Sequence, residues 1–247
     1  MKSKLSGALA LIVICLVLLN GCKEPDSNTT ASIVLVPKWG NSDFALNTLY
    51  PNTAGDSLRF SKMKLFLSEI SLIKSDGSKE LIKDIAYFNM TQSDPTILSA
   101  TSSIFPPGDY TGISFNCGIT DAQNNTDPTQ VSCPNPLCAD NEMYWGATLK
   151  YTYTKIEGNV KRFGSSLFSI FIYHVGLSAN RRTISLQKPL TFTKDANNQL
   201  KIDLDIRKIL DGNDPLNMAT DYNTQTTDNY PLATRFADNI ATAFSIE

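Results

Sequence analysis

Short segments in which apolar and polar residues alternate recur along most of this chain, and this period of two constrains its fold more than any other feature. Side chains of a β-strand point alternately to opposite faces, so the pattern is typical of strands with one buried face. Turn-forming runs such as Asp76-Gly77 and Pro106-Pro107-Gly108-Asp109 separate the segments. The sequence predicts strands at residues 33–36, 58–73, 78–82, 110–119, 144–156, 167–175, 183–186, 190–192 and 200–206.

Local patterns refine this prediction. In segment 58–73, the apolar positions before Ser61 are out of phase with those after Lys62, which predicts a β-bulge there. Asp76-Gly77 predicts a two-residue hairpin turn, because both positions tolerate a positive φ. Segment 167–175 is apolar on both faces, and such a pattern predicts a central strand that is covered on both sides.

The C-terminal end has a different period. Leu232, Phe236, Ile240 and Phe244 recur every fourth residue, which predicts an amphipathic helix with Pro231 in its first turn. Many strands, turn-rich connections and one terminal helix favour an all-β fold, either an antiparallel β-sandwich or a flattened barrel with a short C-terminal helix. We expect residues 31–247 to form this single domain.

The N-terminus has the pattern of a signal peptide. Lys2 and Lys4 precede an apolar run of about a dozen residues, which is too short to span a bilayer stably. The run ends in Leu19-Asn20-Gly21-Cys22, which resembles the bacterial lipobox, whose cysteine is acylated before cleavage. We therefore expect a lipoprotein signal peptide at residues 1–21, lipidation of Cys22, a flexible tether over residues 22–30 and anchoring in the outer membrane, facing the periplasm or the cell surface.

Charge and motifs exclude several classes of function. Removal of Lys2 and Lys4 with the signal leaves a net charge of about −4, whereas nucleic acid and anionic lipid require concentrated positive charge. We therefore expect no nucleic-acid partner. The sequence has no nucleotide-binding loop, nucleophile elbow or zinc-protease motif, and its one histidine, His174, lies in a predicted strand without an obvious nucleophile. We therefore expect that the protein is not an enzyme.

Three cysteines lie in the expected domain. Cys133 and Cys138 flank a stretch rich in proline and asparagine, and an oxidising compartment favours a disulfide between such close neighbours. Cys117 continues the apolar alternation of its strand, which predicts a buried, reduced thiol.

Several motifs, taken in their order and spacing, carry a resemblance to a known family. They are residues 64–72 followed by Asp76-Gly77, residues 107–110 leading into 114–118, residues 143–145 with Tyr151 and 155–158, and residues 173–176. From about Ile33 to the C-terminus the chain resembles the MbnP-like (methanobactin periplasmic binding protein-like) proteins, and its ending is similar to that of Bacteroidetes members. The resemblance implies a secreted β-sandwich that binds copper or a copper-carrying peptide. In some members, histidines and a tryptophan oxidised to kynurenine by a di-haem partner enzyme take part.

On this resemblance, the metal candidates are His174, Trp145 and Met143, with copper as the expected cofactor. Copper(I) favours imidazole and soft sulfur ligands. If segments 144–156 and 167–175 pair on the same side, Trp145 and His174 lie about 5 Å apart. The chain departs from the family pattern, because Trp145-Gly146-Ala147 stands where members often have Trp-x-Trp and no second histidine is present.

A second interpretation of the same residues needs no metal. Met143 and Trp145 would then be core residues, and His174 a hydrogen-bonded interior histidine. The protein would be a non-catalytic lipoprotein that binds a peptide, glycan or protein. Such a module is expected to expose aromatic side chains on loops, for example Trp39, Tyr50 or Tyr222.

Overall fold

The computed structural model describes residues 28–91 and 98–247, which form two mixed β-sheets and three short helices. The larger sheet has the order β10-β7-β4-β8-β9-β12, with β3 and β5 also paired to β4. The smaller sheet has the order β13-β11-β1-β2, with β6 also paired to β1. The strands are β1 (Ala31–Trp39), β2 (Ser42–Asp43), β3 (Leu49–Pro51), β4 (Ser57–Ile73), β5 (Lys79–Thr91), β6 (Ser99–Thr101), β7 (Gly108–Cys117), β8 (Thr152–Lys161), β9 (Phe168–Gly176), β10 (Arg182–Phe192), β11 (Asn198–Asp205), β12 (Asn223–Thr224) and β13 (Phe244–Ile246). The α-helices are α2 (Asp121–Asn124), α3 (Ile206–Asp211) and α4 (Tyr230–Ala241), and short 3-10 turns span Pro128–Gln130, Ala139–Asn141 and Ser178–Asn180.

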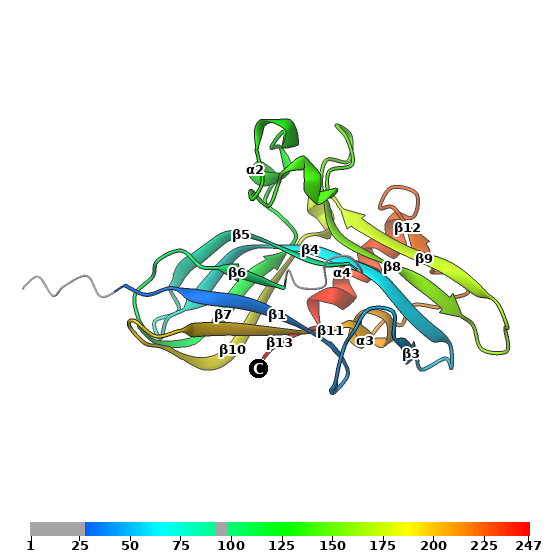
Figure 1. The fold of residues 1–247 in the computed structure, drawn as a ribbon, viewed down its shortest axis with the longest axis horizontal. Helices are drawn as coiled ribbons and strands as arrows, with labels where there is room; N and C mark the ends of the chain where they lie inside the picture. The colour runs from blue at the N-terminus through cyan, green and yellow to red at the C-terminus, as the bar shows by residue number, and fades with distance from the viewer. Residues whose placement is uncertain (1–27, 92–97) are drawn as a thin grey trace, which may run out of the picture.

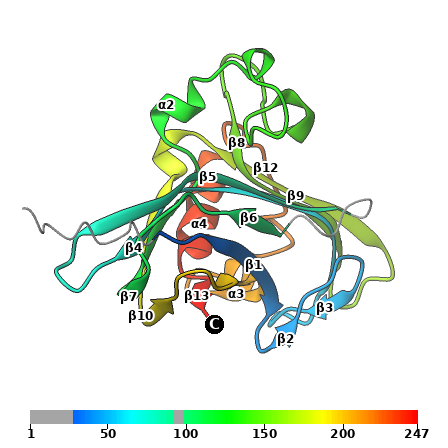
Figure 2. The same ribbon diagram turned by 60° about the vertical axis from the view of Figure 1, so that its left-hand side comes forward.

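The predicted all-β class is confirmed, and the sheets form an open sandwich, not a closed barrel. The larger sheet arches over the smaller one, and α4 lies beneath the arch (Figures 1 and 2). There, the ring of Phe236 on α4 stacks on Tyr173 of β9 with a centroid separation of 5.0 Å. Most strand pairs are antiparallel, as expected, but the sheets are mixed, because β1 pairs with β11, and β9 with β12, in parallel.

The core has two parts. The main core fills the space between the sheets and includes Leu35, Phe115 and Phe171. A second, smaller core lies on the outer face of the larger sheet, where the segment between β7 and β8 covers β4. This outer core consists of Phe66, Ile119, Leu137, Met143, Tyr151 and Tyr153. Figure 2 shows α2 and its neighbouring loops projecting on the side away from the smaller sheet.

Strand β4 contains the predicted bulge, because its pairing with β8 shifts register between Phe60 and Lys62. A second irregularity, at Glu69, was not predicted from the sequence. Glu69 has a φ of 51°, and the pairing of β4 with β7 is interrupted between Ser68 and Ser71. The hairpin turn after β4 is longer than predicted, since a Lys74 N to Ser78 O bond of 2.9 Å encloses three residues and Gly77 adopts a φ of 83°.

Other boundaries differ from the predicted ones. Strand β8 begins at Thr152, not at residue 144, because Gly146 and Lys150 adopt positive φ values and turn the chain. The two segments predicted at 183–186 and 190–192 are one strand, β10, with a register shift after Gln187. The C-terminal helix ends at Ala241, and Phe244, which was predicted to be helical, pairs with Leu204 instead.

The prediction that segment 167–175 is covered on both sides was also wrong. Strand β9 has only β8 and the two-residue β12 as neighbours among the described residues. Its inner face packs through Phe171 and Tyr173 in the main core, but Phe168 and Ile170 on the outer face are exposed. An apolar run therefore did not identify the strand that is buried on both faces.

The expected signal peptide and Cys22 lie outside the described residues. The expected tether overlaps the folded domain at its end, because Thr29 is buried and pairs with Phe105 before β1 begins at Ala31. Across residues 28–91 and 98–247, no helix has the length and apolar character needed to cross a membrane.

Candidate functional site

The outer face of β8 and β9 carries the one histidine of the chain. Period-two alternation places Lys155 and Glu157 of β8 on this face, and His174 of β9 pairs directly with Lys155. The Nε2 atom of His174 lies 2.8 Å from Oε1 of Glu157, and the Lys62 ammonium donates to the same carboxylate oxygen at 3.1 Å. These contacts fix the orientation of the imidazole ring.

This arrangement affects the chemistry of two polar groups, the Glu157 carboxylate and the second ring nitrogen of His174. The hydrogen bond with His174 and, secondarily, the Lys62 ammonium lower the pKa of Glu157 to about 2, against the opposing effect of burial. The carboxylate therefore stays ionised at neutral pH. The other ring nitrogen of His174, Nδ1, is buried and has no hydrogen-bond partner within the described part of the chain. A buried nitrogen of this kind has an unused capacity to bind a ligand.

Trp145 reaches this histidine from a turn and not from a strand. Its backbone N–H donates to the Lys150 carbonyl at 2.6 Å, and Gly146 supplies the positive φ that the turn requires. The indole ring lies over His174 with a centroid separation of 5.0 Å and an interplanar angle of 60°. With 37% of its surface exposed, Trp145 forms the solvent-facing side of the site. The structure thus brings the two residues together, although not as opposed residues of paired strands.

Three lysine side chains lie close to the pair or to its neighbouring carboxylates. The Lys155 ammonium lies 5.3 Å from the centroid of the Trp145 ring and donates to the Glu142 carbonyl. Burial, and then the neighbouring Lys64 and Lys62 ammoniums, lower the pKa of Lys155. The buried Lys64 ammonium pairs with the Glu142 carboxylate at 3.0 Å. The site therefore has three cationic side chains and two anionic ones.

Met143 does not belong to this arrangement. Its side chain is buried in the outer core with Leu137 and Tyr151. Among the residues that the structure describes, no three His, Cys, Asp or Glu side chains gather closely enough to hold an ion. One imidazole nitrogen and an indole with the Lys155 ammonium beside it fall short of the two or three nitrogen and sulfur ligands typical of copper(I). The side chains of this face alone therefore do not fit a bare copper ion.

The structure agrees with the disulfide and the buried free thiol that the sequence predicts for the three domain cysteines. Cys133 and Cys138 are joined, with an S–S distance of 1.98 Å. Cys117 is a buried free thiol whose Sγ lies 3.9 Å from the Thr154 hydroxyl, and burial raises its pKa to about 12. A thiol with such a pKa is not reactive near neutral pH.

The aromatic residues expected to mark an adhesive surface are mostly buried. Trp39 and Tyr50 pack with Phe44 and Phe60 in the main core, where the rings of Trp39 and Tyr50 are 5.0 Å apart. Tyr222 alone of the three expected residues is exposed. The sequence pattern did not reveal this cluster, since Trp39 and Phe60 come from different strands, β1 and β4, and Phe44 and Tyr50 from the stretch between them.

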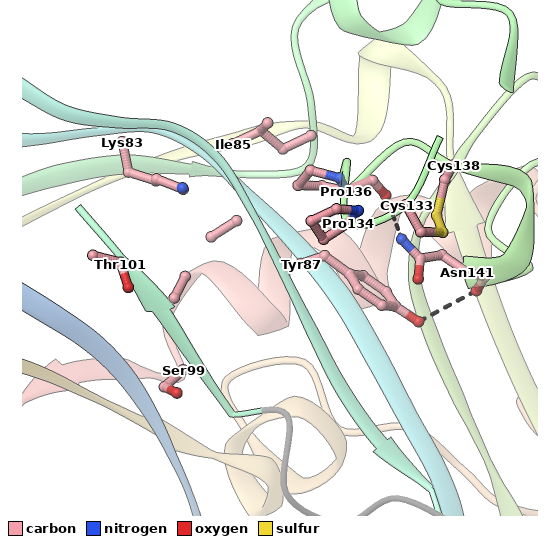
Figure 3. A pocket seen from close by; sticks show the side chains of 12 residues that line it. Lys83, Ile85, Tyr87, Ser99, Thr101, Cys133, Pro134, Pro136, Cys138 and Asn141 are labelled. Atoms are coloured by element: carbon pink, nitrogen blue, oxygen red, sulfur yellow. Dashed lines mark hydrogen bonds between the residues drawn. A yellow bond between two sulfur atoms is a disulfide. The ribbon is translucent and has the colours of Figure 1, made fainter. Parts of the chain in front are cut away.

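A cavity of about 450 Å³ lies elsewhere, between β5, β6 and the disulfide loop. Figure 3 shows Tyr87 and Asn141 on one side and Ser99 and Thr101 on the other, with the Cys133–Cys138 disulfide at its edge. The Tyr87 hydroxyl donates to the Asn141 carbonyl at 3.2 Å. Neither His174 nor Trp145 lines this cavity, so it is separate from the candidate site.

Two residues of the site, Glu157 and Lys155, were not identified as functional from the sequence. The alternation around Ile156 places both side chains on the face opposite the core, so their position on the outer face could have been predicted from the sequence. Their contact with His174 depends on the register between β8 and β9, which no local pattern specifies.

Comparisons with known proteins agree with this fold. The MbnP family model matches residues 28–229, which is most of the chain. The structure is similar to that of MbnP from Methylosinus trichosporium, with a TM-score of 0.54 over 81% of this chain and 83% of that chain, at 13% sequence identity. No curated protein matches this sequence. On the strength of the family match, the chain belongs to the MbnP family.

Proposed function

We propose that this protein is an extracytoplasmic lipoprotein that binds copper carried by a chelating peptide, and that it is not an enzyme. The observation that carries the proposal is the Trp145 ring lying over His174, whose Nδ1 is buried and unpaired in the described structure. A carrier that supplies most of the metal ligands needs only one further donor from the protein. His174 offers that donor once a side-chain movement opens its buried Nδ1 to the carrier, and Trp145 offers an aromatic surface against which the carrier can pack.

The charge of the site supports a carried metal over a bare ion. Lys62 and Lys64 are paired with Glu157 and Glu142, whereas the Lys155 ammonium has no carboxylate partner among the described residues, so the site has a net charge of about +1. This excess opposes the approach of an isolated copper cation and complements a carboxylate of an acidic peptide. The exposure of Trp145 also leaves its ring accessible to a partner protein. This accessibility supports the di-haem, tryptophan-oxidising enzyme that the family resemblance implies as a second partner.

A titration tests the proposed site. The probe is a synthetic peptide with two cysteines and two glutamates, loaded with copper(I) and followed through the fluorescence of tryptophan. We expect His174→Ala to weaken binding of the loaded peptide about tenfold, which corresponds to about 1.4 kcal/mol. Lys79→Ala, on a distant part of the same sheet, is the matched control and should bind like the wild type.

Equal binding of the loaded peptide by wild type and His174→Ala would contradict the proposal. Tighter uptake of copper(I) alone than of the loaded peptide would instead indicate an ion held by protein side chains. If no form of copper binds, the metal-free alternative remains, a surface lipoprotein that binds a peptide, glycan or protein. The exposed side chains of Ile170 and Tyr222 favour that alternative.

The anchor has a separate test. In Cys22→Ala the acylation site is removed, so we expect the variant to be unprocessed or soluble and to be released from membranes by an alkaline wash. The wild-type protein should remain bound under the same conditions. Membrane association of the variant at the wild-type level would argue against the lipoprotein assignment.

A further inference from the structure

The hairpin that joins β8 to β9 exposes apolar side chains outside the proposed copper-peptide site. We refer to residues 161–170 as the hairpin tip. Phe163, Leu167 and Ile170 are 83%, 75% and 65% exposed, and Phe168 beside them is also exposed. Isolated exposed apolar residues are ordinary, but four within eight positions form a patch of the kind that marks an interaction surface.

Hydrogen bonds hold the hairpin tip in place. The Phe163 N–H donates to the Asp56 carboxylate at 2.8 Å, and the Phe163 ring lies against the turn at Gly55, where a Cβ would come within 3.2 Å of it. The Leu167 N–H donates to the Ser165 hydroxyl at 3.1 Å. The backbone is thus ordered by local contacts while the apolar side chains remain directed to solvent.

The charge around these side chains is positive. Lys161 and Arg162 belong to the hairpin tip, and the Arg59 guanidinium lies 5.2 Å from the centroid of the Phe168 ring. The acidic groups at this end, Asp56 and Asp211, are enclosed by hydrogen bonds, and the Asp211 side chain is only 5% exposed. Although the whole chain has a negative net charge, the cations Arg59, Lys161 and Arg162 are concentrated beside the apolar side chains of the hairpin tip.

We propose that the hairpin tip docks on an anionic lipid surface. Aromatic and aliphatic side chains flanked by Arg and Lys match a bilayer interface, in which apolar groups enter the acyl boundary and cations lie among anionic headgroups. A second copy of the chain is a poor occupant, because two cationic patches repel each other. The inference goes beyond the proposed ligand site and rests on the proposed anchoring at Cys22.

The position of the anchor agrees with this docking. Only six residues lie between Cys22 and the folded Thr29, and seven fully extended residue steps span at most about 25 Å. The domain is therefore confined near the membrane, at a high effective concentration. Strand β1 begins at one end of the long axis and the hairpin tip lies at the other (Figure 1). Two attachments at opposite ends would hold the domain lengthwise along the bilayer.

Fluorescence quenching tests this contact on the acylated full-length mature chain, purified with its lipids. An NBD label is placed on Ser166→Cys in the hairpin tip, and in a second sample on Ala122→Cys in α2, where both positions are exposed. The buried Cys117 should not react under native conditions. The labelled chains are inserted into vesicles of phosphatidylcholine, with or without phosphatidylglycerol, that contain a doxyl-labelled quencher lipid.

We expect the label at residue 166 to lose most of its emission in the anionic vesicles and less in the neutral ones, while the label at 122 stays bright. The additional pair Phe163→Ser and Leu167→Ser should abolish the quenching, whereas Leu81→Ser, at an exposed apolar position on β5, should not. Flotation of the protein with the vesicles measures attachment through the lipid anchor, and quenching measures contact of the hairpin tip with the bilayer. The anchoring and the docking proposals can therefore be contradicted independently. A chain that floats with anionic vesicles but whose label at 166 remains unquenched would overturn the docking and leave the anchor intact.

Discussion

Strands β4 and β9 belong to the same sheet, yet their outer faces differ. From Met63 to Ser68, β4 is buried on both faces, because the main core lies on one side and the outer core on the other. Strand β9 is buried on its inner face alone, and apolar side chains such as Ile170 face solvent. Both strands are rich in apolar residues.

The difference between the strands depends on what covers them. The segment between β7 and β8 folds over β4 and supplies Leu137, Met143 and Tyr151. No described segment supplies a comparable cover to the hairpin end of β9, where Phe168 and Ile170 lie. On β4 the apolar outer residue Phe66 packs in the outer core, whereas on β9 the apolar outer residues remain available for an external surface. Apolar character in a strand is thus evidence of burial only when a covering segment can be identified.

The largest expected effect tests the packing on β4. Phe66 is fully buried and makes an edge contact with Tyr151 at a centroid separation of 6.2 Å. Phe66→Ala should lower the free energy of unfolding by about 3 to 5 kcal/mol, as expected for loss of a buried aromatic ring. Ile170→Ala, on β9, should change it by less than about 0.5 kcal/mol. Urea denaturation followed by circular dichroism measures both, and similar losses would show that the two faces are equally covered.

The disulfide gives an intermediate effect, because it closes a loop within the segment that covers β4. Cys133 and Cys138 are five positions apart, and replacing both with Ser should lower the free energy of unfolding by about 2 kcal/mol through the entropy of the open loop. Alkylation of unreduced protein should modify no domain cysteine in the native state and Cys117 alone after denaturation. Three reactive thiols after denaturation would show that the bond is absent.

The smallest effect concerns the charged side chains of β8 and β4 that lie beside His174 of β9. Since the pKa of Glu157 lies near 2 in the folded chain, below its ordinary value of 4.5, folding favours the ionised carboxylate. Its contribution is complete above about pH 4.5 and is lost as the pH falls through about 2. Allowing for partial exposure to solvent, Glu157→Gln should cost about 1 to 2 kcal/mol at pH 7. The stability curves of wild type and variant should converge below about pH 2, and a constant offset across this range would contradict the ionic origin.

Local patterns in the sequence predicted the elements better than the contacts between them. The bulge near Ser61 was predicted correctly, because a change of phase in apolar residues requires it. The start of β8 was placed too early, since Gly146 allows a turn in a segment whose alternation otherwise continues. The apolar residues on both faces of segment 167–175 led to the incorrect prediction that β9 is covered on both sides. A sequence pattern shows which side chains share a face of a strand, but it does not show what packs against that face.

The candidate site was only partly accessible to the same reasoning. His174 and Trp145 were singled out by residue type and family resemblance, and they lie together in the structure. Met143 was grouped with them by the softness of its sulfur, but its side chain packs in the outer core instead. Glu157 was not identified, since its contact with His174 depends on strand pairing between distant segments.

The parallel pair of β1 and β11 has a consequence for the order in which the chain can fold. Ile33 pairs with Leu200, so the first strand of the domain cannot complete its sheet until the chain near residue 200 has emerged. Contacts that are so distant in sequence form slowly, because a long loop must close first. For a chain that we propose crosses a membrane by an N-terminal signal, this delay would keep the early strands from closing before translocation has finished.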